Sequence, residues 1–282
     1  MNNPFSLPEQ APTKRNRRFT RALRELDRFV FTLITQRHRQ GDDTGDLLSM
    51  LLARDEDTGD GMDDQQVRDE IMTMLLAGHE TSAMALTWCW YLLAQHPEVE
   101  QQLHAELGAV LAGRAPGFDD LARLRYTRMV IEETLRLYPP AWGIARQLIE
   151  EDEIGGYRIP KGVQLVVSSY VTHRHPDFWE RPDVFDPERF TPERSTDRPK
   201  FAYYPFGGGP RGCIGQNFAL MEMQLILATL AQRYRLRLVP EHSVEVQPLV
   251  TFRPRHGVMM RLHERTQQWQ RSHGPACSLS AN

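Results

Sequence analysis

The sequence is poor in cysteine and lysine and has no long hydrophobic run. Its 282 residues include three cysteines, an odd and sparse count that excludes a disulfide framework and is typical of a reducing compartment. No stretch reaches the roughly 18 apolar residues that a spanning helix needs, so we expect no transmembrane segment in this chain. The first 18 residues are polar and basic, without the apolar core of a secretory signal. We therefore expect a cytoplasmic location and a bacterial source.

The balance of charge gives no indication of a large polyanionic partner. Lysine occurs three times among the 34 basic residues, and the formal net charge is −3. A weakly acidic chain gives no global footprint for binding DNA or RNA, so we expect no nucleic-acid partner. No internal repeat is visible, and no flavin or nucleotide motif is present. The length allows one large domain or two small ones, with a substantial core in either case.

Helical periodicity dominates the first half of the chain. Residues 1–17, which contain three prolines, are expected to form an irregular lead-in, and apolar residues then recur at helical spacing from Phe19 to about Gln40. A helix of some thirty residues is expected from Asp63, where Asp63 and Gln66 fit a capping box, to Gln95. Shorter helices are expected over 46–54, 97–112, 126–137 and 215–234.

The second half of the sequence shows strand patterns and a long irregular stretch in place of continuous helical periodicity. Strands are expected within 153–158, 163–170, 236–239 and 257–262. Residues 174–212 are rich in Pro, Gly and Arg and show neither helical nor strand periodicity, and a long irregular stretch of this kind usually has a function. Residues 264–282 are expected to be a disordered tail. The sequence thus predicts a mainly α fold with a small β region.

The strongest single signal is the segment from Phe206 to Gly215, with the sequence FGGGPRGCIG. Five glycines in ten residues permit positive φ angles and a close approach of the backbone to a bulky, flat partner. Cys213 stands just before a predicted helix, whose N-terminal dipole and free N–H groups stabilise a thiolate. Arg211 is placed to pair with a carboxylate near that sulfur. A purely structural cysteine at a glycine-rich helix entry is the alternative that the local sequence leaves open.

A second signal lies in the middle of the long predicted helix, where Ala77 to Thr81 read AGHET. Gly78 is unfavourable in a helix interior by about 1 kcal/mol relative to alanine, and it lets a ligand approach the backbone. Thr81 can hydrogen-bond a ligand or its own i−4 carbonyl, and Glu80 can deliver protons. The alternative is a helix with Glu80 on a solvated face and Thr81 in the core.

Together these segments resemble the cytochrome P-450 family. Phe206, Gly209, Arg211, Cys213 and Gly215 match its haem-binding signature, and 77–81 resembles its oxygen-activation motif. The resemblance implies haem b (iron protoporphyrin IX) with the Cys213 thiolate as axial ligand of the iron, a haem propionate on Arg211, and catalytic roles for Glu80 and Thr81 beside Gly78. It implies that residues 18–263 are the C-terminal part of a single cytochrome P-450 domain, N-terminally truncated, because the oxygen-activation motif comes far earlier than the family places it.

The same resemblance extends to structural positions. Glu133 and Arg136 match the family's Glu-x-x-Arg segment, and 187–190 resembles the segment that supplies a third charged residue, Arg189. The resemblance implies that these three form a buried triad that holds the irregular loop beneath the haem. Arg146 matches an arginine that contacts a haem propionate, with an exposed strand arginine as the alternative.

The function implied by the resemblance is that of a haem-thiolate monooxygenase, an oxidoreductase that inserts one atom of dioxygen into a hydrophobic small molecule. A separate ferredoxin- or flavoprotein-type donor would supply electrons, with Arg211, Arg233, Arg235 and Arg237 as candidates for its docking face. The apolar segments 141–144 and 249–251 match substrate-facing turns. Two alternatives stay open, a truncated non-catalytic haem-binding remnant and a haem-thiolate isomerase or lyase.

Overall fold

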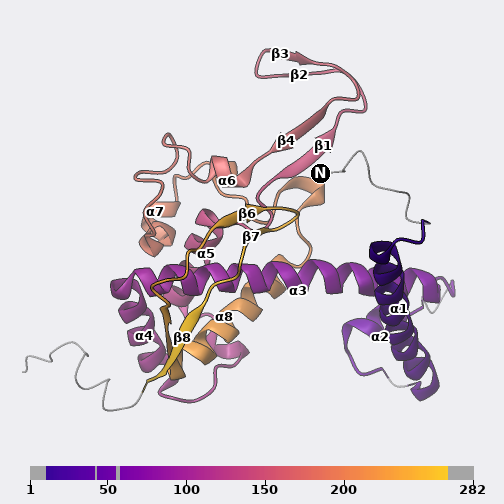
Figure 1. Cartoon of the computed structure of the whole chain (residues 1–282), viewed down its shortest axis with the longest axis horizontal. Helices are drawn as coiled ribbons and strands as arrows, with labels where there is room; N and C mark the ends of the chain where they lie inside the picture. Colours follow the sequence, from indigo (N-terminus) through magenta and orange to yellow (C-terminus); the bar gives the residue numbers. More distant parts are fainter. Residues whose placement is uncertain (1–10, 42, 55–57, 266–282) are drawn as a thin grey trace, which may run out of the picture. The chain divides into compact units, whose positions relative to one another are not determined.

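The computed structural model describes residues 11–41, 43–54 and 58–265 (Figure 1). The chain divides into two compact units, residues 1–79 and 80–282, and the long helix α3 (Asp64–Gln95) belongs to both. The single domain expected over residues 18–263 therefore stays a prediction. Within the described ranges no helix is both long enough and apolar enough to cross a membrane.

The first unit contains α1 (Lys14–Gln40), α2 (Leu47–Leu52) and the first half of α3. Helix α1 begins five residues before Phe19, inside the segment predicted to be irregular, because the Thr13 hydroxyl accepts a hydrogen bond from the Asn16 N–H at 3.0 Å. The predicted capping box of α3 is confirmed, since the Asp63 carboxylate and the Gln66 side chain each accept the other residue's backbone N–H. A small core of Val30, Ile34, Val67 and Met72 holds the unit together.

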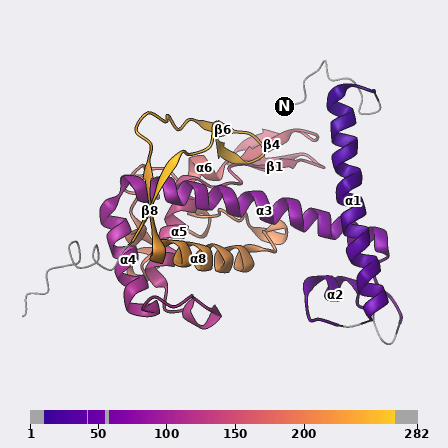
Figure 2. The ribbon, with the colours of Figure 1, turned by 60° about the horizontal axis from the view of Figure 1, so that its bottom comes forward.

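The second unit is built on four helices that share one apolar core. The second half of α3 packs with α4 (Pro97–Leu111), α5 (Arg125–Leu137) and α8 (Gln216–Arg233), as Figure 2 shows. The predicted starts and ends of these helices are confirmed to within a residue or two. Trp88 of α3 stacks on the Tyr138 ring at 4.2 Å and donates from its indole nitrogen to the Phe252 carbonyl at 2.8 Å. This contact fixes the central helix against the C-terminal segment.

Among its described residues, the β structure of the second unit consists of four antiparallel pairs and one isolated bridge between Arg255 and Gly257. The pairs are β1 (Ile144–Gln147) with β4 (Gln164–Val167), β2 (Asp152–Ile154) with β3 (Tyr157–Ile159), β5 (Tyr234–Leu238) with β8 (Met260–Glu264), and β6 (Val246–Pro248) with β7 (Phe252–Pro254). The sequence did not predict the β6–β7 pair. The strand expected over 163–170 ends at Val167, because Ser168 caps the short helix α6 (Ser169–Thr172).

The predicted irregular stretch contains only single turns of helix. These are η2 (Pro187–Phe190), α7 (Pro192–Ser195), η3 (Lys200–Ala202) and η4 (Gly209–Arg211), and a further turn, η1 (Phe118–Asp120), precedes α5. At the C-terminal end the predicted tail was placed too early, because Glu264 is paired in β8 and the Arg265 N–H donates to the Arg233 carbonyl at 2.8 Å. The rest of that tail lies outside the described residues.

Candidate functional site

Cys213 lies on the turn that leads into α8, and its side chain is exposed. The Cys213 N–H donates to the Phe206 carbonyl at 2.9 Å, which closes the glycine-rich loop on itself. Gly207 and Gly209 adopt φ angles of 72° and 69°, in the left-handed region that favours glycine. A Cβ at Gly215 would stand 3.9 Å from the Cys213 sulfur, an ordinary contact, so the described residues alone do not require glycine there. The loop therefore presents the sulfur outward.

The surroundings of Cys213 fit a flat, apolar, anionic partner. Ile214 next to it is 98% exposed. Arg211 is exposed on the loop, and Arg146 is exposed on β1, where its Nη1 donates only to the neighbouring Ala145 carbonyl at 2.8 Å. Within the described ranges neither arginine pairs with a carboxylate. An exposed sulfur at a helix N-terminus, an apolar neighbour and two unpaired cations are the groups that a haem with two propionates requires, so the residues present fit it.

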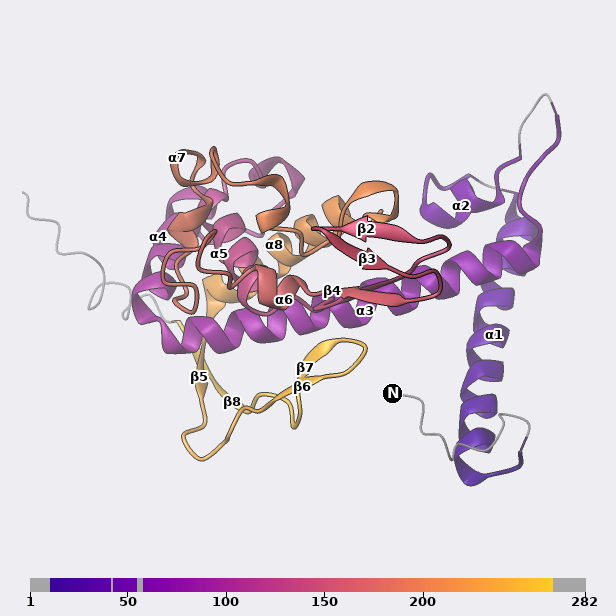
Figure 3. The ribbon, with the colours of Figure 1, turned by 90° about the horizontal axis from the view of Figure 1, so that it is seen from above.

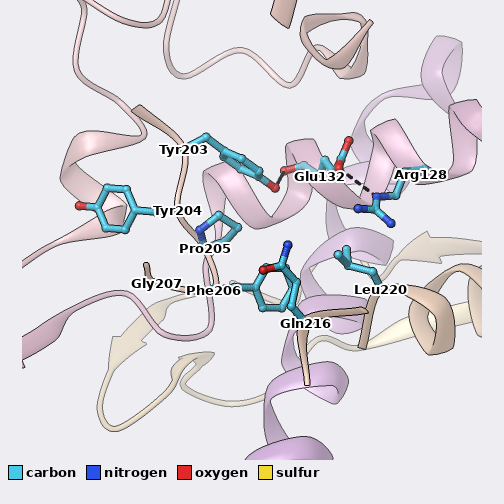
Figure 4. A pocket seen from close by; sticks show the side chains of 9 residues that line it. All are labelled: Arg128, Glu132, Tyr203, Tyr204, Pro205, Phe206, Gly207, Gln216 and Leu220. Carbon is cyan, nitrogen blue, oxygen red and sulfur yellow. Dashed lines mark hydrogen bonds and ion pairs between the residues drawn. The ribbon is translucent and has the colours of Figure 1, made fainter. Parts of the chain in front are cut away.

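A small cavity of about 100 Å³ lies beneath this loop, between the loop, α5 and α8 (Figure 4). Its floor is braced by the Arg128–Glu132 ion pair at 2.9 Å and by the Tyr203 hydroxyl, which donates to the Glu132 carbonyl at 3.0 Å. Phe206 of the loop lines the cavity together with Gln216 and Leu220 of α8 (Figure 4). The loop thus rests on side chains of two helices.

Glu80 and Thr81 lie on α3 at the start of the second unit, and both are partly buried. Gly78, two residues before Glu80 on the same helix, belongs to the first unit. The Thr251 hydroxyl donates to Glu80 Oε1 at 2.7 Å. Thr251 follows the apolar Leu249 and Val250, and sequence reasoning placed it in a substrate-facing turn without assigning it a partner. The lone hydroxyl after an apolar pair was the only available signal.

The structure brings Glu133, Arg136 and Arg189 together in the interior. Glu133 and Arg136 are fully buried, and Arg189 is 3% exposed. The Arg136 guanidinium donates to both Glu133 oxygens, from Nε at 2.6 Å and from Nη2 at 2.8 Å, and Arg189 Nε lies 3.4 Å from Glu133 Oε1. This geometry is bidentate for the first pair and looser for the second.

The Arg136 guanidinium also binds backbone carbonyl groups of the irregular segment. Its Nη1 donates to the carbonyls of His173 and Pro182, at 2.8 and 2.6 Å, and its Nη2 donates to that of Val184 at 3.1 Å. The Asp186 N–H donates to Glu133 at 2.9 Å. Backbone carbonyls in irregular structure need such partners when they are buried. The ion pair therefore fixes the course of residues 173–186.

His173 links this ion pair to the cysteine loop, a role for which the sequence gave no signal. The ring is fully buried, its Nδ1 lies 3.3 Å from the Arg136 carbonyl, and its Nε2 accepts the Tyr204 N–H at 2.9 Å. Burial lowers the pKa of His173 to about 3, so the ring is neutral and donates from Nδ1. The Tyr204 carbonyl in turn accepts a hydrogen bond from the Gly207 N–H at 3.0 Å, and Gly207 belongs to the loop that carries Cys213.

Two of the arginines considered for a docking face are engaged elsewhere. Arg235 and Arg237 form ion pairs with the buried Glu100 of α4, at 2.8 and 2.9 Å. Arg233 is exposed at the end of α8. Arg235 and Arg237 are therefore partly buried and held by Glu100.

Comparisons with known proteins identify the family to which the chain belongs. The family model for cytochrome P450 matches residues 1–261. Cyclooctatin synthase of Streptomyces melanosporofaciens is 45% identical over 248 residues, which cover 87% of this chain and 54% of the relative. Pentalenene oxygenase of Streptomyces avermitilis is 38% identical, with 93% and 58% covered. The solved structure of retinoic acid bound cyanobacterial CYP120A1 superposes with a TM-score of 0.85 at 34% identity, over 93% of this chain and 60% of that one.

The chain spans about half the length of the curated relatives that it matches. The mainly α fold with small β pairs is thus the fold of this family over the matched part.

Proposed function

Since the chain belongs to the cytochrome P450 family, we propose that it carries the proximal and oxygen-activating parts of a haem-thiolate monooxygenase. Members of the family bind haem b, and two of the relatives are named as oxygenases, cyclooctat-9-en-7-ol 5-monooxygenase of Streptomyces melanosporofaciens and pentalenene oxygenase. The observation that carries the proposal is the exposed Cys213 at the start of an 18-residue helix, on a loop whose form depends on positive-φ glycines.

In this proposal Cys213 provides the sulfur that binds the haem iron. Arg211 and Arg146 would take the two propionates of the haem. When bound, the haem supplies activation of dioxygen, which the electron-rich thiolate favours.

In the proposed site, protons would be held and moved by the side chains of Glu80, Thr81 and Thr251. Thr251 keeps one oxygen of Glu80 engaged, which leaves the second oxygen to carry a proton. Thr81, one residue along α3, offers a hydroxyl for orienting an oxygen ligand. The Glu133–Arg136–Arg189 triad has a structural role, because it holds the segment that supports the loop.

The substrate and the donor are finer parts of the proposal. Apolar residues at 141–144 and 249–251 suit a hydrophobic small molecule, and a ferredoxin- or flavoprotein-type donor would provide electrons. A cytoplasmic location stays a prediction.

The test is reconstitution of the purified chain with haem, followed by reduction and addition of carbon monoxide. We expect the red-shifted ferrous–CO band of a thiolate ligand. Cys213→Ser should abolish this band, while Cys89→Ser, whose thiol is buried away from the loop, should retain it as the matched control. Retention of the band in the Cys213 variant would refute the ligand assignment.

A further inference from the structure

A two-stranded ladder far along the chain from Cys213 has a strongly basic face. Strands β5 and β8 run side by side (Figure 3), with Arg235 opposite His263 and Arg237 opposite Arg261. Residues directly opposite each other in an antiparallel pair share a face, as do residues two apart on one strand. Arg265 continues this face one step beyond His263. Like charges directly opposite are destabilising, so Arg237 and Arg261 call for a compensating anion.

One carboxylate of the described chain reaches this face. Glu100 of α4 is 1% exposed, and its Oε2 lies 2.8 Å from Arg235 Nε and 2.9 Å from Arg237 Nη2. Its Oε1 accepts from Arg237 Nη1 at 3.3 Å. Arg265 donates from Nη1 to the carbonyls of Ala231 and Gln232, at 2.7 and 3.1 Å, at the C-terminal end of α8. Among the described residues no carboxylate lies within ion-pair distance of Arg265, and Glu100 is fully used by the other two.

His104 is the second, independent observation. It lies one turn beyond Glu100 on the same side of α4, and it is 7% exposed. Both of its ring nitrogens are buried, and neither has a hydrogen-bond partner in the described part of the chain. Burial, followed by the charges of Arg265, Arg235 and Arg237, lowers the pKa of His104 to about 3. The ring is therefore neutral near pH 7 and has one N–H to donate beside three guanidinium groups.

The charge sum indicates the ligand. The four arginines of this face, at 235, 237, 261 and 265, contribute +4 and Glu100 contributes −1, which leaves +3 in a partly buried cluster. A tetrahedral dianion would offset most of this charge and accept several N–H donors at once, and the planar guanidinium fork suits phosphate oxygens.

We propose that the face formed by Arg237, Arg261 and Arg265, with His104 as an inner neutral donor, is a binding site for a phosphate-type oxyanion. The ligand is inorganic phosphate or the phosphomonoester of a small metabolite. The α8 carbonyls hold Arg265 in position, and Glu100 holds Arg237, so the donors are preorganised. Arg261 and His263, which are exposed, form the rim by which the anion enters.

The test uses the 282-residue chain and radiolabelled inorganic phosphate in equilibrium dialysis, at mildly alkaline pH where phosphate is a dianion. We expect saturable binding of one phosphate per chain, and a rise in melting temperature that chloride at equal ionic strength does not reproduce. Competition with glycerol phosphate separates the sources: tighter binding of the ester points to a phosphorylated metabolite, and equal or weaker binding points to free phosphate.

Variants assign the residues. Arg265→Gln and Arg261→Gln should each weaken phosphate binding about tenfold or more, since each removes a charged donor. His104→Phe preserves the packing and should weaken binding by a smaller factor, which keeps the test decisive if Arg265→Gln does not fold. Arg158→Gln, an exposed arginine on β3 paired with Glu151, is the matched control and should leave binding unchanged. Stabilisation by all salts alike, or equal binding by the four variants, would overturn the proposal.

Discussion

Removal of Arg136 should destabilise the fold strongly and in a pH-dependent way. In Arg136→Met the side-chain volume is largely kept, but Glu133, fully buried, loses its bidentate partner and keeps the Asp186 N–H at 2.9 Å and Arg189 Nε at 3.4 Å. Breaking a buried ion pair from one side costs about 3–5 kcal/mol. For a unit of this size that corresponds to a fall in melting temperature of roughly 6–20 °C.

The sign of the pH dependence follows from the stranded carboxyl. Burial already raises the pKa of Glu133 and contact with Arg136 opposes that shift, so the variant has the higher folded-state pKa. A folded state that binds more protons than the unfolded state loses stability as pH rises, and regains it as pH falls through the folded pKa. The deficit of Arg136→Met relative to the parent chain should therefore shrink at mildly acid pH.

The assay is urea denaturation of both chains at neutral and at mildly acid pH. The double variant Glu133→Gln with Arg136→Met removes the stranded charge and should be more stable than Arg136→Met alone. A deficit below about 1 kcal/mol, or one that does not change with pH, would contradict the reasoning.

Three further predictions concern single side chains. His173→Phe should speed hydrogen exchange at the Tyr204 amide and lower the free energy of unfolding by about 1–3 kcal/mol. Burial lowers the pKa of His173 from 6.5 to about 3, so the parent chain should lose stability as pH falls below 6.5. His173→Phe should lose less stability than the parent chain over that pH range. Iodoacetamide should label the exposed Cys213 before Cys89, which should react only on unfolding, since burial raises the pKa of Cys89 to about 12; peptide mass spectrometry would reveal the reverse order if the assignment is wrong. In a chain completed with the N-terminal part of a relative, Thr81→Ala should keep haem but divert electrons to hydrogen peroxide, and unchanged coupling of electrons to product would make Thr81 an ordinary helix residue.

The sequence predicted the elements whose cause is local. The capping box at Asp63 and the proline at position 97 are short-range signals, and both ends of α3 and the start of α4 followed from them. The start of α1 was missed because Thr13 stands among prolines, whose presence outweighed its capping potential. The β6–β7 pair was missed because three-residue strands carry no readable alternation.

The residues of the candidate site also divide into those with a local sequence signal and those without one. Cys213 and the charged triad could be identified because their neighbours in sequence match a family pattern. Thr251 and His173 could not, since their partners Glu80 and Tyr204 lie 171 and 31 residues away and a hydroxyl or an imidazole alone has many uses. The engagement of Arg235 and Arg237 by Glu100 likewise depends on α4 packing against β5, which no local pattern encodes.

The anchoring of residues 173–186 to Arg136 has a consequence for the order of assembly. The carbonyls that Arg136 binds lie 37, 46 and 48 residues downstream of it, so each contact closes a long loop, whose entropy must be overcome before the bonds form. Contacts of such high sequence separation form slowly in folding. The Cys213 loop depends on them through His173 and Tyr204, so it should acquire its final form only after α5 has docked. Maturation with cofactor would then report on late folding, and a slow-folding variant would accumulate as an apoprotein with normal helix content.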